Sequence, residues 1–345
     1  IYPGGIHSTS GATWAAAAGA LSLGRVNPAR IAQSFSAHPF YDDFWRQIDI
    51  TDNLDDIRVP TLLFGAWQDL FTNGTVRDFE GRSDNAWLVM GAGQHGFAHD
   101  DPHSPVPLGA ILAWWDHWLK QAPDAPLPSA RVTSFELPTT RGGGWQQLST
   151  WPPSDVQSKR LYLGADRTLS SRPGPRGTTR HEVNRFDGPA RSWFANYLAY
   201  PESPVADQGV PDRQRLTYTS GPLTNDAVVA GSARVHLRAA LSARNGYFVV
   251  KVEDVAPTGE VVAATDGYLK ASRRAGDTHD VTITPGEFHE YTVPISPTHW
   301  RFAKGHRIRV AVTSGDLPLI PPDAPTGMVT IANGAGGSWI DLPLR

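Results

Sequence analysis

The chain has 345 residues, which is enough for roughly two domains with substantial cores. Its 31 basic and 34 acidic residues give a formal net charge of -3, so no overall charge favours nucleic acid or an anionic membrane as a partner. Having no cysteine excludes disulfides, thiolate metal sites and a cysteine nucleophile. No apolar run approaches the roughly 18 residues of a membrane span, and 33 glycines and 29 prolines favour a turn-rich fold.

The first 57 residues predict short helices and loops. An alanine-rich stretch at 13–23 has high helix propensity, and residues 28–57 are rich in aromatic and acidic side chains. The first residue is Ile1 and the first methionine is Met90, so we expect further chain upstream. A cytoplasmic and a secreted location both stay open.

Residues 58–125 have the pattern of an α/β unit. The short apolar runs at 59–65 and 86–91 predict strands buried on both faces, as in a parallel sheet. Residues 72–82 between them predict a helix. Residues 107–121 place Leu108, Ile111, Leu112, Trp115 and Leu119 on one helical face, which predicts an amphipathic helix that covers the sheet.

The pattern changes after a proline-rich stretch at 122–128, which marks the predicted domain boundary. Apolar and polar residues then alternate at 233–239, 248–253 and 307–312, which predicts half-buried strands. Turn signals separate these strands, at 245–246, 257–259, 285–286 and 304–305. We therefore expect residues 126–345 to form an all-β sandwich of jelly-roll type.

Asp69 and His95 are the candidate catalytic pair. Each follows one of the two predicted parallel strands, so both emerge at the carboxyl edge of the sheet, where open α/β sheets place their sites. An aspartate that accepts a hydrogen bond from the imidazole Nδ1–H fixes the tautomer and leaves Nε2 free to take a proton from a nucleophile. Serine, aspartate and histidine follow in that order in α/β-hydrolases, and here Asp69 precedes His95.

The nucleophile of such a triad is missing from the pattern. The stretch 20–24 has the form A-x-S-x-G around Ser22, but a predicted helix precedes it rather than a strand. Ser8 and Ser10 are equally weak candidates. A zinc site of His95, His99 and His103 is an alternative, although Gly96 and Pro102 argue against the helix that it needs.

Acidic residues before the first predicted strand offer a different possibility. They could recognise a substrate ammonium group or simply be solvated, and they comprise Asp42, Asp43, Asp49, Asp52, Asp55 and Asp56.

Several motifs together resemble the cocaine-esterase-like hydrolases, which include the X-Pro dipeptidyl-peptidases (peptidase family S15). Residues 38–45 resemble the HP…D-x-x-W motif of that family, and residues 59–71 its V-P-x-L…W-x-D-x-F acid segment. Residues 91–96 resemble its G-P-W-x-H-G base segment, with Ala92 and Gly93 in place of proline and tryptophan. Later matches are Trp145, the Trp-Pro-Pro step at 151–153, the G-H-R-I-R strand at 305–309 and the closing L-P-x at 342–344.

The resemblance implies the C-terminal part of an α/β-hydrolase with a cap, followed by a jelly roll. Residues 1–57 would be a cap-like helical segment, 58–125 the end of the hydrolase domain and 126–345 the jelly roll. The family is one of serine hydrolases that cleave a small ester, an amide or a short peptide without a cofactor or metal. We expect Asp69 and His95 to be catalytic, and the substrate to meet Asp42, Trp45, Trp67 and Phe71.

The resemblance also implies that the serine and an oxyanion-hole tyrosine lie upstream, on a hydrolase segment in cis or on a separate chain. We therefore expect these 345 residues alone to be inactive. The alternative is a non-catalytic jelly roll that binds carbohydrate or another ligand on exposed aromatic rings. Trp300 and Trp339 are its candidate platforms, whereas Trp87, Trp115 and Trp118 are expected in the hydrolase core.

Overall fold

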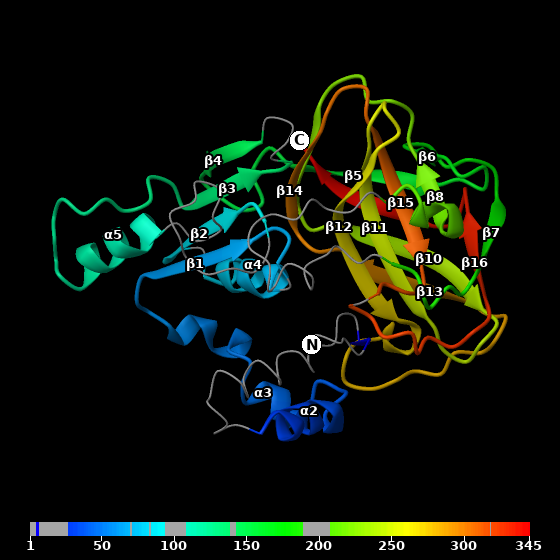
Figure 1. The fold of residues 1–345 in the computed structure, drawn as a ribbon, viewed down its shortest axis with the longest axis horizontal. Coiled ribbons are helices and arrows are strands. Elements are labelled where there is room, and N and C mark those ends of the chain that lie inside the picture. Colours follow the sequence, from blue (N-terminus) through cyan, green and yellow to red (C-terminus); the bar gives the residue numbers. More distant parts are fainter. Residues whose placement is uncertain are drawn as a thin grey trace.

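The computed structural model describes residues 5–6, 27–69, 71–82, 84–93, 108–138, 143–188, 208–317 and 319–345. An α/β part comes first along the chain and a larger β-rich domain follows it (Figure 1). The helix predicted at 13–23 lies outside the described residues.

Short helices precede the sheet, as the sequence predicts. They are α2 (Pro28–Ala37), α3 (Asp43–Arg46) and the 3-10 helix η2 (Thr51–Asp56). Asn27 caps α2 by accepting a hydrogen bond of 2.9 Å from the Ala29 amide. Asp42 caps α3 in the same way, with 3.1 Å to the Phe44 amide. Helices α2 and α3 therefore each begin where a side chain accepts from an amide that the first turn leaves unpaired.

A strand-helix-strand unit forms the start of the sheet. Strands β1 (Thr61–Ala66) and β2 (Ala86–Gly91) pair in parallel, and α4 (Thr72–Glu80) connects them. Gly65 lets β1 and β2 pack closely, because a Cβ there would lie 2.8 Å from the Met90 Sδ and would require that side chain to shift. The predicted strands and helix of this unit are confirmed.

The α/β sheet extends past the predicted boundary at residue 125. Strand β3 (Val132–Glu136) pairs in parallel with β2, and β4 (Gly144–Leu148) pairs antiparallel with β3. The prolines at 122–128 end a helix, but they connect it to the next strand of the same sheet. A proline-rich linker between domains and a proline-rich loop within one have the same composition, so the predicted domain bounds stay a prediction.

Helix α5 (Leu108–Trp118) forms as predicted, but its packed face differs from the predicted one. Its buried residue is Trp114, whose ring lies 5.3 Å from that of Trp87 on β2. Leu112 and Trp115, on the predicted face, are 55% and 50% exposed. In Figure 1 the helix stands at the edge of the α/β part, away from the β-rich domain.

Two antiparallel sheets form the β-rich domain. Among the described residues the larger sheet contains β5 (Gln157–Leu163), β6 (Leu169–Ser170), β7 (Gly177–Glu182), β9 (Ala227–Gly231), β10 (Arg234–Leu241), β13 (Phe288–Pro294), β14 (Thr298–Phe302), β16 (Met328–Asn333) and β17 (Trp339–Leu344). The smaller has the order β12 (Val261–Lys270), β11 (Tyr247–Val255), β15 (Arg307–Thr313), β8 (Leu216–Thr219). Short 3-10 turns are η4 (Pro211–Gln214) and η5 (Ala271–Arg273).

The two sheets share one apolar core. Phe248 of β11 meets Tyr291 of β13 with ring centroids 4.6 Å apart. The β-rich second half is thus confirmed, whereas its jelly-roll form stays a prediction.

Strand β11 is buried along its whole length, and not on one face only. Lys251 and Glu253 alternate with apolar residues, yet both have no exposed surface. The Lys251 ammonium donates to Asp316 at 2.7 Å, and the Glu253 carboxylate lies 3.7 Å from Arg215. Segments from outside the sheet cover this face, which strand alternation does not reveal.

The α/β part and the β-rich domain are joined by backbone and side-chain contacts. The Leu137 amide donates to the His299 carbonyl at 2.8 Å, and the Arg301 amide donates to the Leu137 carbonyl at 2.8 Å. Trp67, after β1, packs against Trp151 with ring centroids 4.7 Å apart. The core is therefore continuous from one part to the other.

Candidate active site

Asp69 lies at the carboxyl edge of the α/β sheet, just beyond β1. The parallel ladder continues past the strand end, because the Trp67 amide donates to Gly91 at 3.1 Å and the Gln68 amide to Gly93 at 3.0 Å. The half-buried Asp69 carboxylate accepts a hydrogen bond of 3.1 Å from the Phe71 amide. The Thr72 hydroxyl donates to the Asp69 carbonyl at 2.6 Å, which fixes the turn into α4.

His95, the predicted partner of Asp69, lies outside the described residues. So do His99 and His103 of the zinc alternative, and the weak nucleophile candidates Ser8, Ser10 and Ser22. The structure describes the loop after β2 as far as Gly93.

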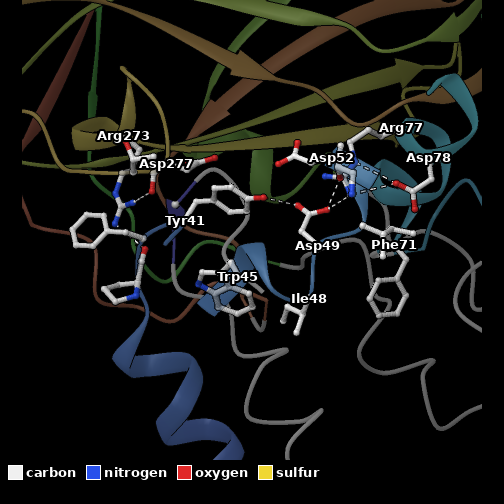
Figure 2. Close-up of a pocket in the computed structure, with 16 residues that line it drawn as sticks. Tyr41, Trp45, Ile48, Asp49, Asp52, Phe71, Arg77, Asp78, Arg273 and Asp277 are labelled. Carbon is white, nitrogen blue, oxygen red and sulfur yellow. Dashed lines mark hydrogen bonds and ion pairs between the residues drawn. The ribbon is translucent and has the colours of Figure 1, made fainter. Parts of the chain in front are cut away.

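A cavity of about 960 Å³ opens beside this edge (Figure 2). Four regions line it: Gly5, the cap segment between α2 and β1, Phe71 together with Arg77 and Asp78 of α4, and a loop of the β-rich domain that contains Arg273 and Asp277. Asp69 does not line the cavity, but Phe71 does, and the Phe71 amide donates to the Asp69 carboxylate at 3.1 Å.

Polar contacts organise one wall of the cavity. The Asp49 carboxylate accepts hydrogen bonds from the Tyr41 hydroxyl at 3.1 Å and from the amide and hydroxyl of Thr51, and it lies 3.6 Å from the Arg77 guanidinium (Figure 2). The Thr51 hydroxyl bond is the main cause that lowers the pKa of Asp49. Burial, followed by the hydrogen bond to Asp49, raises the pKa of Tyr41. Both groups are therefore held in their ordinary ionisation states at neutral pH, with Asp49 charged and Tyr41 neutral.

Aromatic side chains supply much of the remaining lining. The indole of Trp45 donates to the His38 carbonyl at 2.8 Å and stacks on Phe35 at 5.5 Å. Phe71 is 44% exposed, a high value for a phenylalanine. The structure thus places Trp45 and Phe71, two of the predicted substrate-facing residues, at the cavity.

Asp42 and Trp67, the other two predicted substrate-facing residues, do not belong to the lining. Asp42 caps α3 and pairs with the His38 imidazole at 2.6 Å, and this hydrogen bond is the main cause that lowers the pKa of Asp42. Trp67 has no exposed surface and packs on Trp151.

Sequence reasoning missed most of the polar lining. Tyr41, Arg77, Arg273 and Asp277 line the cavity, and no motif singled them out. Asp49 was part of the acidic cluster, but nothing distinguished it from its neighbours. Spacing gives no signal for the residues at 273 and 277, because the fold brings them to the cavity from more than 200 positions away.

The tryptophans proposed as a carbohydrate platform are engaged within the protein. Trp300 is 1% exposed, and its indole donates to Asp254 at 3.2 Å. The Trp339 ring stacks on His236 at 4.7 Å, and the Arg160 guanidinium lies 4.6 Å from its centroid. Trp300 therefore offers no open ring face, and Trp339 is already stacked.

Within the described ranges no cluster of three or more metal-ligating side chains is present. No helix in those ranges is long and apolar enough to cross a membrane.

Comparison with known sequences identifies the family. The model of the X-Pro dipeptidyl-peptidase C-terminal non-catalytic domain matches residues 127–336, and that of X-Pro dipeptidyl-peptidase (S15 family) matches residues 7–97. The chain belongs to the cocaine esterase and X-Pro dipeptidyl-peptidase family. The resemblance of its motifs to the S15 family is thus confirmed. The chain is also similar to the cocaine esterase of Rhodococcus sp. (strain MB1 Bresler), with 27% identity over 338 residues, covering 89% of this chain and 57% of the esterase.

Solved structures of similar hydrolases share the fold. A CocE/NonD family hydrolase from Staphylococcus aureus has a TM-score of 0.80 at 17% identity, covering all of this chain and 65% of that one. An α-amino acid ester hydrolase has a TM-score of 0.77 at 22% identity, again covering all of this chain and 65% of that one. These likenesses support an α/β-hydrolase part with a β-rich domain. The chain spans less than two thirds of the length of each of these relatives.

Proposed function

We propose that this chain supplies the acid and base residues of a serine hydrolase that cleaves an ester or an amide. Asp69 orients the imidazole of His95, and His95 acts as general base and then as general acid. The nucleophilic serine belongs to a segment upstream of these residues. The position of Asp69 at the carboxyl edge of the parallel sheet, beside the strand that leads to His95, carries the proposal.

Chain connectivity supports the pairing of these two residues. The Gln68 amide is hydrogen-bonded to the Gly93 carbonyl at 3.0 Å, and Gly93 is two residues before His95. Consecutive Cα atoms are 3.8 Å apart, so the His95 Cα is within about 7.6 Å of the Gly93 Cα. That distance is short enough for an imidazole to reach the Asp69 carboxylate.

The proposed reaction proceeds through an acyl-enzyme. The serine Oγ transfers its proton to His95 Nε2 and attacks the carbonyl carbon, forming a tetrahedral oxyanion. When this intermediate collapses, the bond to the leaving group breaks and His95 returns the proton to that group. Water then deacylates the enzyme by the same route, with His95 accepting its proton. Asp69 accepts the Nδ1–H bond throughout, and no cofactor is needed.

The cavity beside Asp69 is the proposed substrate chamber. Its aromatic lining suits apolar groups of a small ester, an amide or a short peptide. Phe71 joins the chamber to the catalytic edge, because its amide donates to the Asp69 carboxylate while its ring lines the cavity.

An upstream hydrolase segment, in cis or as a separate chain, is the proposed partner. Among the described strands β1 pairs with β2 alone, so its other edge is available to a further strand. Apolar side chains on α5 and just after it are exposed as well, with Leu112 55% exposed and Leu119 71% exposed. A segment that adds strands beside β1 would also bring helices to the faces of the sheet.

The test compares the 345-residue chain with the protein extended upstream, using 4-nitrophenyl acetate as the substrate. We expect hydrolysis and fluorophosphonate labelling only with the extended protein. His95→Ala should lower kcat/KM by at least about 10³-fold, and activity should fall below about pH 6.5 as the imidazole protonates.

His99→Ala is the matched control, because it removes a histidine of the same segment. It should leave kcat/KM within about twofold. Hydrolysis by the short chain that His95→Ala abolishes, or a flat profile from pH 5 to 9, would contradict the proposal. Equal loss in both histidine variants, together with inhibition by a chelator, would favour the zinc alternative.

A further inference from the structure

Arg273 is a buried arginine that connects the β-rich domain to the cap wall of the cavity. Its side chain is 2% exposed. The guanidinium donates to the Asp280 carboxylate at 2.7 Å, to the Asp277 carbonyl at 2.9 Å and to the Pro39 carbonyl at 2.9 Å. The first two partners belong to the β-rich domain and the third to the cap. The planar guanidinium, with its diverging N–H bonds, therefore bridges the β-rich domain and the cap.

The cap side of this contact is made by three consecutive residues. The Arg273 guanidinium carbon lies 4.0 Å from the centroid of the Phe40 ring, next to the Pro39 carbonyl that it also binds. The Tyr41 amide then donates to the Asp277 carbonyl at 2.8 Å. Residues 39–41 are thus held by a hydrogen bond, a cation–π contact and a backbone hydrogen bond in succession.

Residues 39–41 form part of the cavity wall. The Tyr41 ring points from the Arg273 loop toward Asp49, and its hydroxyl donates to the Asp49 carboxylate at 3.1 Å (Figure 2). Asp49 in turn lies 3.6 Å from Arg77 of α4. A chain of contacts therefore runs across the cavity wall from the β-rich domain, through the cap, to the helix that follows Asp69.

A third segment closes around the stem of Arg273. A Cβ on Gly5 would lie 2.4 Å from the Arg273 Cγ, and Gly5 has a φ of +78°, which favours glycine. The next residue, Ile6, is fully buried beside Tyr247 and Val249 of the β-rich domain. The arginine therefore has little freedom to leave its position.

We propose that Arg273 is a positioning residue, through which the β-rich domain holds residues 39–41 and so sets the affinity for substrates large enough to reach this wall. The affinity part rests on the proposed hydrolase function, whereas the holding of the cap does not. Loss of the contact frees Tyr41 and the wall behind it, but leaves Asp69 and the sheet edge in place.

The test uses the full-length protein and two variants from opposite sides of the contact. Arg273→Lys keeps the charge but cannot reach Asp280, Asp277 and Pro39 together. Phe40→Leu removes the stacked ring from the cap without altering the β-rich domain. Arg160→Lys is the matched control, because Arg160 also pairs with a carboxylate and lies over an aromatic ring but does not line the cavity.

The first readout is hydrogen exchange in a peptide that covers residues 38–46. Both variants should accelerate exchange of the Tyr41 amide by about tenfold or more, whereas Arg160→Lys should not. This readout needs no activity, so it stands even if the proposed hydrolase function fails.

The second readout compares 4-nitrophenyl 3-phenylpropionate with 4-nitrophenyl acetate. We expect KM for the bulky ester to rise at least about fivefold in both variants, with a smaller change in kcat and in the KM for acetate. The double variant should have the KM of one single variant, because both changes break the same contact.

Two results would overturn the proposal. Unchanged exchange in both single variants would show that the contact does not hold the cap. Faster exchange with an unchanged KM for the bulky ester would show that the held wall does not set affinity. If the wild type hydrolyses neither ester, the proposed function fails, and the exchange result alone decides whether Arg273 holds the cap.

Discussion

This molecule has two candidate places for a catalytic triad, the proposed one around Asp69 and a set of three residues in a different environment. Asp69 lies half-buried at the open edge of the α/β sheet beside a large cavity. A second set, Ser134, His299 and Glu136, lies between β3 and β14, where the Ser134 hydroxyl is 2.7 Å from His299 Nδ1 and Glu136 is 3.6 Å from Nε2. All three of these residues are at most 1% exposed.

Access and partners separate the two sets. No substrate can reach Ser134, because it is fully buried. The Glu136 carboxylate is engaged by the Arg301 guanidinium at 2.6 Å, and burial is the main cause that lowers the pKa of His299 to about 4. The buried set thus joins the two parts of the molecule through hydrogen bonds and the Glu136–Arg301 ion pair, with an uncharged His299 at neutral pH. Residue identity and proximity do not make a catalytic site without a cavity beside them.

We expect the largest effect from replacing the Asp69 carboxylate, which should behave differently from the Glu136 carboxylate. Asp69→Asn in the full-length protein should lower kcat/KM by about 10³- to 10⁴-fold, because the amide no longer holds the imidazole in the productive tautomer. The free energy of unfolding should change little, since the asparagine oxygen still accepts from the Phe71 amide. Glu136→Gln is the comparison, and it should lower stability rather than kcat. Steady-state kinetics with 4-nitrophenyl acetate measure kcat/KM, and urea unfolding measures the free energy of unfolding. A loss of kcat in Glu136→Gln and a loss of stability alone in Asp69→Asn would contradict the assigned roles.

His299, the buried histidine, should make the free energy of unfolding depend on pH. His299 has a pKa of about 4 when folded and about 6.5 when unfolded, so the unfolded chain binds more protons between these values. Stability is therefore full above about pH 6.5 and falls as pH drops toward 4, by up to about 3 kcal/mol from this group. Urea unfolding at pH 4.5 and 7.5 measures this loss of stability in the wild type, and we expect a smaller loss in His299→Gln. An equal pH difference in wild type and variant would contradict it.

The smallest effect concerns the hydroxyl of the buried set. Ser134→Ala removes the partner of His299 Nδ1 and leaves a buried polar atom unsatisfied, which should cost about 1–3 kcal/mol in the free energy of unfolding. The kcat per folded molecule should stay the same, because this serine is not the nucleophile. Loss of fluorophosphonate labelling in this variant would instead make Ser134 the reactive serine.

Local sequence pattern predicted the parts of the site that lie next to each other along the chain. The apolar run at 59–65, the helix after it and the second run at 86–91 gave the strand-helix-strand unit, and hence the place of Asp69 at the edge. Sequence also placed Trp45 and Phe71 near the substrate, and the structure puts both in the cavity lining.

Other features needed the three-dimensional arrangement. Composition does not reveal that β3 and β4, which follow the proline-rich stretch, pair into the same sheet as β1 and β2. Alternation predicted a solvated face for Lys251, which Asp316 and Tyr268 cover in the fold, with Asp316 accepting from both side chains at 2.7 Å.

By itself the sequence determined the family, the order of an α/β part and a β-rich domain, and the candidate catalytic pair, because periodicity and motifs act over neighbouring residues. Only the tertiary structure decided which side chains form the cavity and which triad-like set is sealed. Arg273 meets Pro39 and Phe40 across 233 or more positions of the chain, through the packing of one domain on another. Such contacts follow from the burial of whole surfaces, which no local spacing encodes.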